Sequence, residues 1–99
     1  MNTIRERDKF SIGANVVACE LDDGRALLDL SKSQYYRLNR TAAIVWEWLE
    51  EESASIDELT IKMLGRFDVE ESTCRADLTT MLNTFLEAGL VEQIITPSG

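Results

Sequence analysis

The side chains of this chain that could carry chemistry are carboxylates and two cysteines, because none of the 99 residues is histidine. Histidine is a common general base near neutral pH and a common zinc ligand, so its absence weakens both kinds of site. Cys19 and Cys74 are far apart in the sequence and belong to no CxxC pair. We interpret them as small apolar core residues rather than as a disulfide, a nucleophile or metal ligands. The sequence therefore predicts no enzyme, no metal site and no cofactor.

Paired carboxylates are the next candidates for a site. Asp22 and Asp23 could bind a cation, but they precede Gly24 in a pattern typical of a tight hairpin turn. The glutamates at 50–52 and 70–71 are interpreted as solvated charges near helix ends. The sequence also contains no glycine-rich phosphate loop. A binding role is therefore favoured over catalysis.

The charge balance limits the possible partners. The chain has 18 acidic and 10 basic side chains, a net charge of −8, which disfavours nucleic acids and other polyanions. It has no run of about 18 apolar residues, so we expect no membrane span. Residues 1–10 are highly charged and lack the apolar segment of a signal peptide. We expect a cytoplasmic protein that is a monomer or a weak dimer.

Alternating patterns predict three short strands in the first half of the chain. The turn at Asp22, Asp23 and Gly24 would join the first two strands into a hairpin. In the third strand, Tyr36 and Leu38 share one face. The predicted strands are residues 16–21, 25–30 and 35–38. Together they would form an antiparallel meander with one apolar face.

Three helices are predicted in the second half, where the apolar spacing changes to a helical period. Asn39 or Thr41 can cap the first helix, and Ser55 with Glu58 has the form of a capping box for the second. Gly89 stands where a residue just past a helix end belongs. The predicted helices run to the glutamates at 50–52, over 56–67, and from 71 or 72 to 88, with a last extended segment over 90–95.

The predicted fold is α+β and winged-helix-like, with a three-stranded antiparallel meander followed by a three-helix bundle in the order β-β-β-α-α-α. Residues 1–15 are expected to form a flexible segment in which Phe10 and Ile12 could act as anchors. Residues 16–95 would form the domain, and residues 96–99 a frayed end.

Two binding functions fit this outline. A winged-helix transcriptional regulator would place its third helix in the major groove of DNA, but this helix carries only Arg75 as a cation, beside Asp77 and Glu87. Alternatively, the edge of the third strand could capture an extended peptide. Met81 and Phe85 on the third helix would then form the opposite wall of the groove.

Several segments, taken in combination, resemble the PqqD family. They are the run Asp23-Gly24-Arg25-Ala26-Leu27-Leu28-Asp29-Leu30, the run Tyr35-Tyr36-Arg37-Leu38-Asn39, residues 42–46 with Trp46, the helix start at 55–59, Asp77, and the ending at 88–91. The resemblance extends over residues 16–91. Ser33 stands where the family usually has a glycine in the loop before the tyrosines.

Members of this family are RiPP recognition elements, small domains that bind the leader part of a ribosomally made precursor peptide. The resemblance implies that this chain is a non-catalytic peptide chaperone that presents its precursor to a modifying enzyme. The enzyme implied is a leader protease with a cyclase of lasso peptide synthesis, which we favour, or a radical SAM enzyme of a pyrroloquinoline quinone type pathway. The leader would add to the third strand, in the cleft beside the third helix.

The expected leader-binding residues come from these two elements. On the strand they are Gln34, Tyr35, Tyr36, Arg37 and Leu38, and on the helix Cys74, Asp77, Leu78, Met81 and Phe85. Helical phase places the apolar members on one stripe but does not decide whether Leu78, Met81 and Phe85 face the core or the groove. Asp77 could pair with a leader lysine or arginine, or it could be a helix-surface charge.

Overall fold

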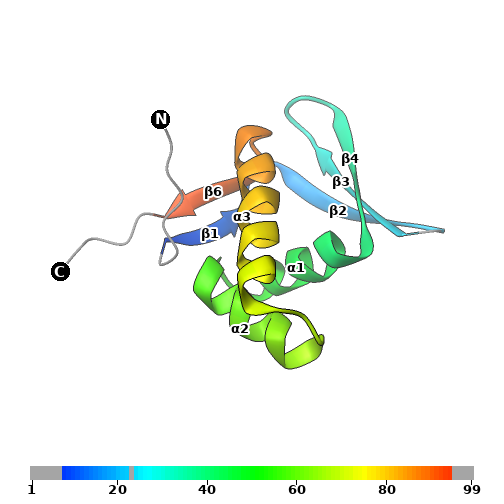
Figure 1. Ribbon diagram of the computed structural model, residues 1–99. Helices are drawn as coiled ribbons and strands as arrows, with labels where there is room; N and C mark the ends of the chain where they lie inside the picture. The colour runs from blue at the N-terminus through cyan, green and yellow to red at the C-terminus, as the bar shows by residue number, and fades with distance from the viewer. Residues whose placement is uncertain (1–7, 23, 95–99) are drawn as a thin grey trace.

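A long helix, α3 (Glu71–Glu87), stands between two small antiparallel sheets in the view of Figure 1. The computed structural model describes residues 8–22 and 24–94. One sheet has the strand order β5-β1-β6 and the other β2-β3-β4. The elements besides α3 are β1 (Lys9–Ile12), β2 (Val16–Leu21), β3 (Gly24–Asp29), β4 (Gln34–Leu38), α1 (Arg40–Glu51), β5 (Ala54–Ser55), α2 (Ile56–Arg66) and β6 (Val91–Ile94). The α+β prediction is confirmed, whereas the order of strands and helices is richer than predicted.

The predicted meander is present as the β2-β3-β4 sheet. Leu21 pairs directly with Gly24 across a two-residue loop, and Gly24 has φ +148°, a conformation that favours glycine. Asp29 pairs with Gln34 at the next turn. The third predicted strand, residues 35–38, begins one residue earlier in the structure, at Gln34.

The faces of this sheet follow from its alternation. Leu27 is fully buried and pairs with Tyr36, which is half-buried against the core. Leu28 and Tyr35 form the neighbouring pair and point to the opposite face, where Tyr35 is 66% exposed. The predicted common face of Tyr36 and Leu38 is therefore the core face, since Leu38 also packs against the core.

The structure differs from the sequence prediction in the N-terminal segment. Residues 1–15 were expected to be flexible, but β1 forms within them and pairs antiparallel with β6 and with β5. Phe10 is fully buried, as expected of an anchor, and Ile12 packs against the core. The amide of Gly13 donates to the carbonyl of Leu90 at 2.9 Å, and a Cβ on Gly13 would lie only 3.2 Å from two backbone oxygens. Residues 1–7 and 96–99 lie outside the described residues.

Helices α1 and α2 begin where their capping residues predict. Asn39 caps α1 by accepting a hydrogen bond from the amide of Ala42 at 2.8 Å. Ser55 and Glu58 form the full capping box of α2. Past the end of α3, Gly89 takes φ +77°, the left-handed conformation expected at that position. The extended segment predicted over 90–95 is present as β6 over Val91–Ile94, and residue 95 lies outside the described residues.

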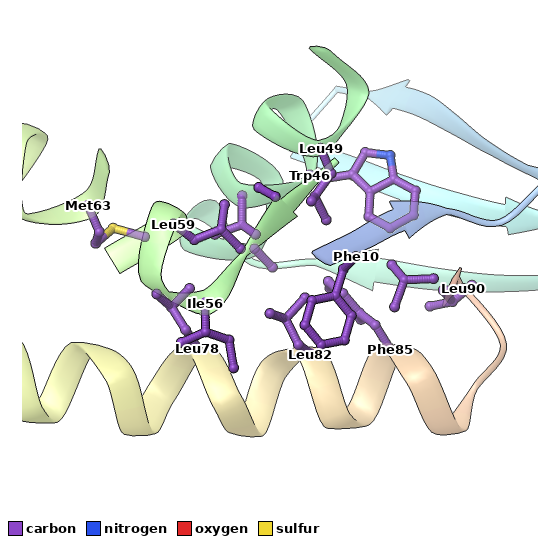
Figure 2. Close-up of a cluster of buried hydrophobic side chains, with 14 of the residues drawn as sticks. Phe10, Trp46, Leu49, Ile56, Leu59, Met63, Leu78, Leu82, Phe85 and Leu90 are labelled. Atoms are coloured by element: carbon purple, nitrogen blue, oxygen red, sulfur yellow. The ribbon is translucent and has the colours of Figure 1, made fainter. Parts of the chain in front are cut away.

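One side of α3 builds the core of the domain. Figure 2 shows Leu78 of α3 beside Ile56 of α2, and Leu82 and Phe85 projecting from α3 toward Phe10 of β1 and toward α1. Phe85 packs edge-to-face on Trp46 of α1, with ring centroids 5.8 Å apart and an interplanar angle of 87°. Phe10 of β1 is enclosed between these helices. This packing fixes α3 against α1, α2 and the β5-β1-β6 sheet.

The turn between β3 and β4 is held by a buried carboxylate. Oδ1 of Asp29 accepts hydrogen bonds from the Ser31 hydroxyl at 2.7 Å, the Ser31 amide at 3.0 Å and the Lys32 amide at 3.3 Å. Ser33, at the end of the turn, has φ 54°. This is the left-handed region that favours glycine, which matches the glycine usual for the resembled family at this point.

The conformation of Ser33 predicts that Ser33→Gly stabilises the fold. Glycine removes a left-handed penalty of roughly 1 kcal/mol, partly offset by the greater freedom of glycine in the unfolded chain. We expect a gain of about 0.5 kcal/mol in the free energy of unfolding. Urea denaturation measures it, with Ser33→Ala as the matched control, because alanine keeps the penalty. Equal stability of the glycine and alanine variants would contradict the prediction.

Asp29 predicts a loss of stability at acidic pH. The hydrogen bond from the Ser31 hydroxyl, aided by the Lys32 and Ser31 amides, lowers the pKa of Asp29 below its ordinary value of 3.8, against an opposing effect of burial. Its contribution is therefore fully present above pH 3.8 and is lost as the pH falls through the lowered pKa. Urea unfolding from about pH 6 to about pH 2 should show a smaller acid loss for Asp29→Asn than for the wild type. Parallel curves for the two proteins would contradict this role.

Candidate functional site

A cleft of about 490 Å³ lies between the end of β4 and one flank of α3. Arg37 and Leu38 line it from β4, and Asp77, Met81 and Phe85 line it from α3. Its remaining lining residues are Asn39, Thr41, Ala42, Thr80 and Thr84. The cleft thus has an apolar floor with a rim of hydroxyl and amide groups and one charge of each sign.

A smaller pocket of about 200 Å³ continues from this cleft between α2 and α3. It shares Thr41, Asp77 and Met81 with the cleft. Cys74 and Leu78 lie in its wall. Its other lining residues are Met63, Phe67, Val69 and Thr73. Two adjoining hollows therefore follow the exposed flank of α3.

The structure brings seven of the ten sequence-predicted site residues to these two hollows. The five in the cleft and the two in the adjoining pocket are Arg37, Leu38, Asp77, Met81, Phe85, Cys74 and Leu78. Gln34, Tyr35 and Tyr36 lie on the first half of β4 and line neither hollow. The hydroxyl of Tyr36 donates to Oε1 of Gln34 at 2.8 Å.

The helix residues whose orientation was left open divide between core and cleft. Leu78 is 1% exposed and Phe85 is 7% exposed, and both project into the core in Figure 2. Leu78 also lines the smaller pocket, and Phe85 also lines the cleft. Met81 is half-buried and lines both hollows, so it is the apolar side chain of α3 most available to a ligand. Asp77 is exposed and lines both as well.

The strand pairing determines which backbone N–H and C=O groups of β4 point toward β3 and which point to the outer edge of the sheet. In an antiparallel pair, directly opposite residues alternate between exchanging hydrogen bonds and not doing so. Leu21 and Gly24, which flank the two-residue loop, therefore form a pair that exchanges backbone hydrogen bonds. Leu30 and Asn15 are an even number of positions further along the two strands, and the amide of Leu30 donates to the carbonyl of Asn15 at 2.8 Å, as this pattern requires. Residues 24, 26, 28 and 30 therefore direct their backbone groups toward β2.

The remaining residues of β3 must then direct their backbone groups toward β4. Leu27 exchanges hydrogen bonds with Tyr36, and the same parity applies to the pairs at 25–38 and 29–34. On β4, the backbone N–H and C=O of Tyr35 and Arg37 consequently point to the outer edge of the sheet. Within residues 8–22 and 24–94, no strand pairs with β4 at that edge.

The cysteine in the smaller pocket is a poor nucleophile. Burial, reinforced by the nearby charge of Asp77, raises the pKa of the Cys74 thiol above its ordinary value. Cys74 is buried and Cys19 half-buried, and both are free thiols. Cys19 is therefore more exposed to solvent than we predicted for a core residue. In the described part of the chain, no cluster of three or more acidic, cysteine or histidine side chains could hold a metal ion.

Sequence reasoning missed the polar rim of the cleft as a set. Thr80 and Thr84 follow Asp77 by three and seven residues and so share its flank of α3. That spacing was a usable signal, but threonines at helical spacing are common on exposed helix faces. Asn39 and Thr41 were identified only as possible helix caps.

The sequence predicted no membrane span, and the described helices bear on this prediction. None of them is both long and apolar enough to cross a bilayer.

The fold is similar to that of solved proteins. One is "TbiB1 in Complex with the TbiA(beta) Leader Peptide", with a TM-score of 0.76 and 27% sequence identity, covering 83% of this chain and 94% of that chain. Another is "Lasso peptide synthetase B1 complexed with the leader peptide", with a TM-score of 0.72 and 24% identity, covering 84% and 96%. The second likeness concerns the fold alone. No curated protein matches the chain.

The sequence itself matches a family described as coenzyme PQQ synthesis protein D. The match extends over residues 24–91, from the start of β3 to the start of β6. It includes both walls of the cleft and the edge strand β4. This chain belongs to the PqqD family.

Proposed function

We propose that this chain is a non-catalytic recognition protein that binds the leader segment of a ribosomally synthesised precursor peptide. The leader adds as a strand to the outer edge of β4 and lies in the cleft formed with α3. The protein delivers the precursor to a modifying enzyme, for which a leader protease and cyclase of lasso peptide synthesis are favoured. A radical SAM enzyme is the next candidate.

The observation that carries this proposal is that backbone N–H and C=O groups of β4 point to the outer edge of the sheet, next to the cleft. Tyr35 directs its N–H and C=O to the sheet edge, where an added strand can exchange hydrogen bonds with them. Leu38 and Met81, on opposite walls of the cleft, can receive apolar side chains of that strand. Main-chain bonds then supply affinity and the cleft supplies selectivity.

The relatives support the same role. One protein of similar fold, TbiB1, is 27% identical and was solved in complex with the TbiA(beta) leader peptide. The family match includes the two elements that form the cleft here. Free thiols at Cys19 and Cys74 agree with a reducing compartment, so we place this function in the cytoplasm.

The alternative of DNA binding is disfavoured by the charges on α3. Arg75, the cation of this helix, forms ion pairs with Asp57 and with Glu71, the latter at 3.3 Å from Nε. Asp77 is exposed on the same helix. A helix that enters the major groove presents several cations to phosphates, which α3 does not.

A proline pair at β4 tests the mode of binding. Proline removes one backbone N–H and is tolerated at a sheet edge only where that N–H points outward. Tyr35→Pro should stay folded and lose leader binding, whereas Tyr36→Pro should unfold, because its N–H bonds to Leu27 within the sheet. Circular dichroism measures folding. Fluorescence anisotropy measures peptide binding. The probes are labelled synthetic peptides, each with the sequence of the N-terminal half of a short protein encoded next to the gene of this chain.

Side-chain effects are separated by alanine controls. Tyr35→Ala and Tyr36→Ala remove the rings but keep both amides, so comparison within each pair isolates the loss of the N–H. A folded Tyr35→Pro variant that binds as tightly as Tyr35→Ala would exclude strand addition at this edge. Binding of a labelled DNA duplex by the wild type, with none of any peptide, would instead support the regulator alternative.

A further inference from the structure

A tether joins the turn before β4 to the end of α3. The ammonium of Lys32 donates a hydrogen bond to the backbone carbonyl of Ala88 at 3.1 Å, across 56 residues of sequence. A Cβ on Gly89 would lie 3.5 Å from the same nitrogen, so the ammonium lies against both Ala88 and Gly89. The two walls of the cleft are thus connected at one end.

The end of α3 has an electrostatic need for this cation. The last carbonyls of a helix lack partners within the helix, and the helix dipole places partial negative charge there. The last turn of α3 contains no basic residue, and Glu87 adds a negative charge to it. Lys32 therefore supplies from another element the positive charge that the last turn of α3 lacks.

The position of Lys32 is itself fixed. Its backbone amide donates to Oδ1 of the buried Asp29, as do both donors of Ser31. Gln34, the first residue of β4, follows two residues later. At the other end of β4, Asn39 caps α1. The edge strand is therefore held at both ends, by α1 at one and by the α3 tether at the other.

We propose that Lys32 is a positioning residue for peptide binding, which holds β4 at the distance from α3 that an added strand requires. This rests on the proposed function of the cleft. The lysine need not touch the peptide. Loss of the tether would let the first half of β4 move relative to α3, and the peptide would then have to order it, at a cost in affinity.

The test compares Lys32→Met with Lys62→Met. Methionine keeps most of the aliphatic stem of lysine and removes the charge. Lys62 lies on α2, with Nζ 5.8 Å from the centre of the Trp48 ring, and lines neither hollow. Both variants have the same net charge, so an effect of net charge alone on peptide association is equal in the two.

Two readouts are measured at a temperature where every variant is folded. The peptide used is the labelled one, from a reading frame flanking the gene, that the wild type binds. For it we expect Lys32→Met to raise Kd about fivefold, as for the loss of one ordinary, solvent-exposed hydrogen bond. Lys32→Arg should restore most of the affinity, and Lys62→Met should leave it unchanged. In the peptide-free protein, ¹⁵N relaxation should show lower order parameters at Tyr35 in Lys32→Met only.

The outcomes separate this inference from the proposed function. If Lys32→Met matches Lys62→Met in both Kd and the order parameter of Tyr35, Lys32 has no positioning role. A lower melting temperature with unchanged Kd and order parameter would likewise overturn it, because it describes a purely structural cap. If the wild type binds no peptide, the proposed function fails, and the relaxation data alone still decide whether Lys32 restrains β4.

Discussion

The two-residue loop between Leu21 and Gly24 fixes the hydrogen-bond parity of the whole β2-β3-β4 sheet, and the candidate site depends on that parity. Because opposite residues alternate between bonded and non-bonded pairs, the loop decides that Leu27 directs its backbone groups toward β4, where the pairing of Asp29 with Gln34 places Tyr36 opposite it. The two registers together direct the backbone groups of Tyr35 outward. A one-residue change in register would turn Leu27 out of the core and exchange these roles, so core packing and edge chemistry are coupled.

Helix α3 has two functions in this arrangement, and each belongs to a different side of the helix. Leu78, Leu82 and Phe85 pack into the core, which makes the helix a rigid wall. Met81 and Asp77 lie toward the cleft and give that wall its apolar and charged groups. A peptide would therefore meet one surface fixed by core packing and one fixed by a strand edge. Such preorganisation limits what a disordered leader must overcome, since its own ordering already costs free energy.

Local signals in the sequence predicted most of the fold and about half of the site's chemistry. The capping box at Ser55, the glycine at 89 and the hairpin before Gly24 are signals carried by neighbouring residues, and the structure confirms them. Strand β1 was missed because its partner β6 lies about 80 residues away and no local pattern indicates that pairing. Orientation around α3 was undecidable for Phe85, because helical phase does not say which neighbour, Trp46 or a ligand, occupies each side.

The most direct test of strand addition is amide hydrogen exchange at Tyr35 and Tyr36, with and without a bound leader peptide. The account predicts that the Tyr36 amide is protected in both states, because it bonds to Leu27 within the sheet. It predicts that the Tyr35 amide exchanges rapidly in the free protein and becomes protected when the peptide saturates the site. Unchanged exchange of the Tyr35 amide in a saturated complex would contradict the account.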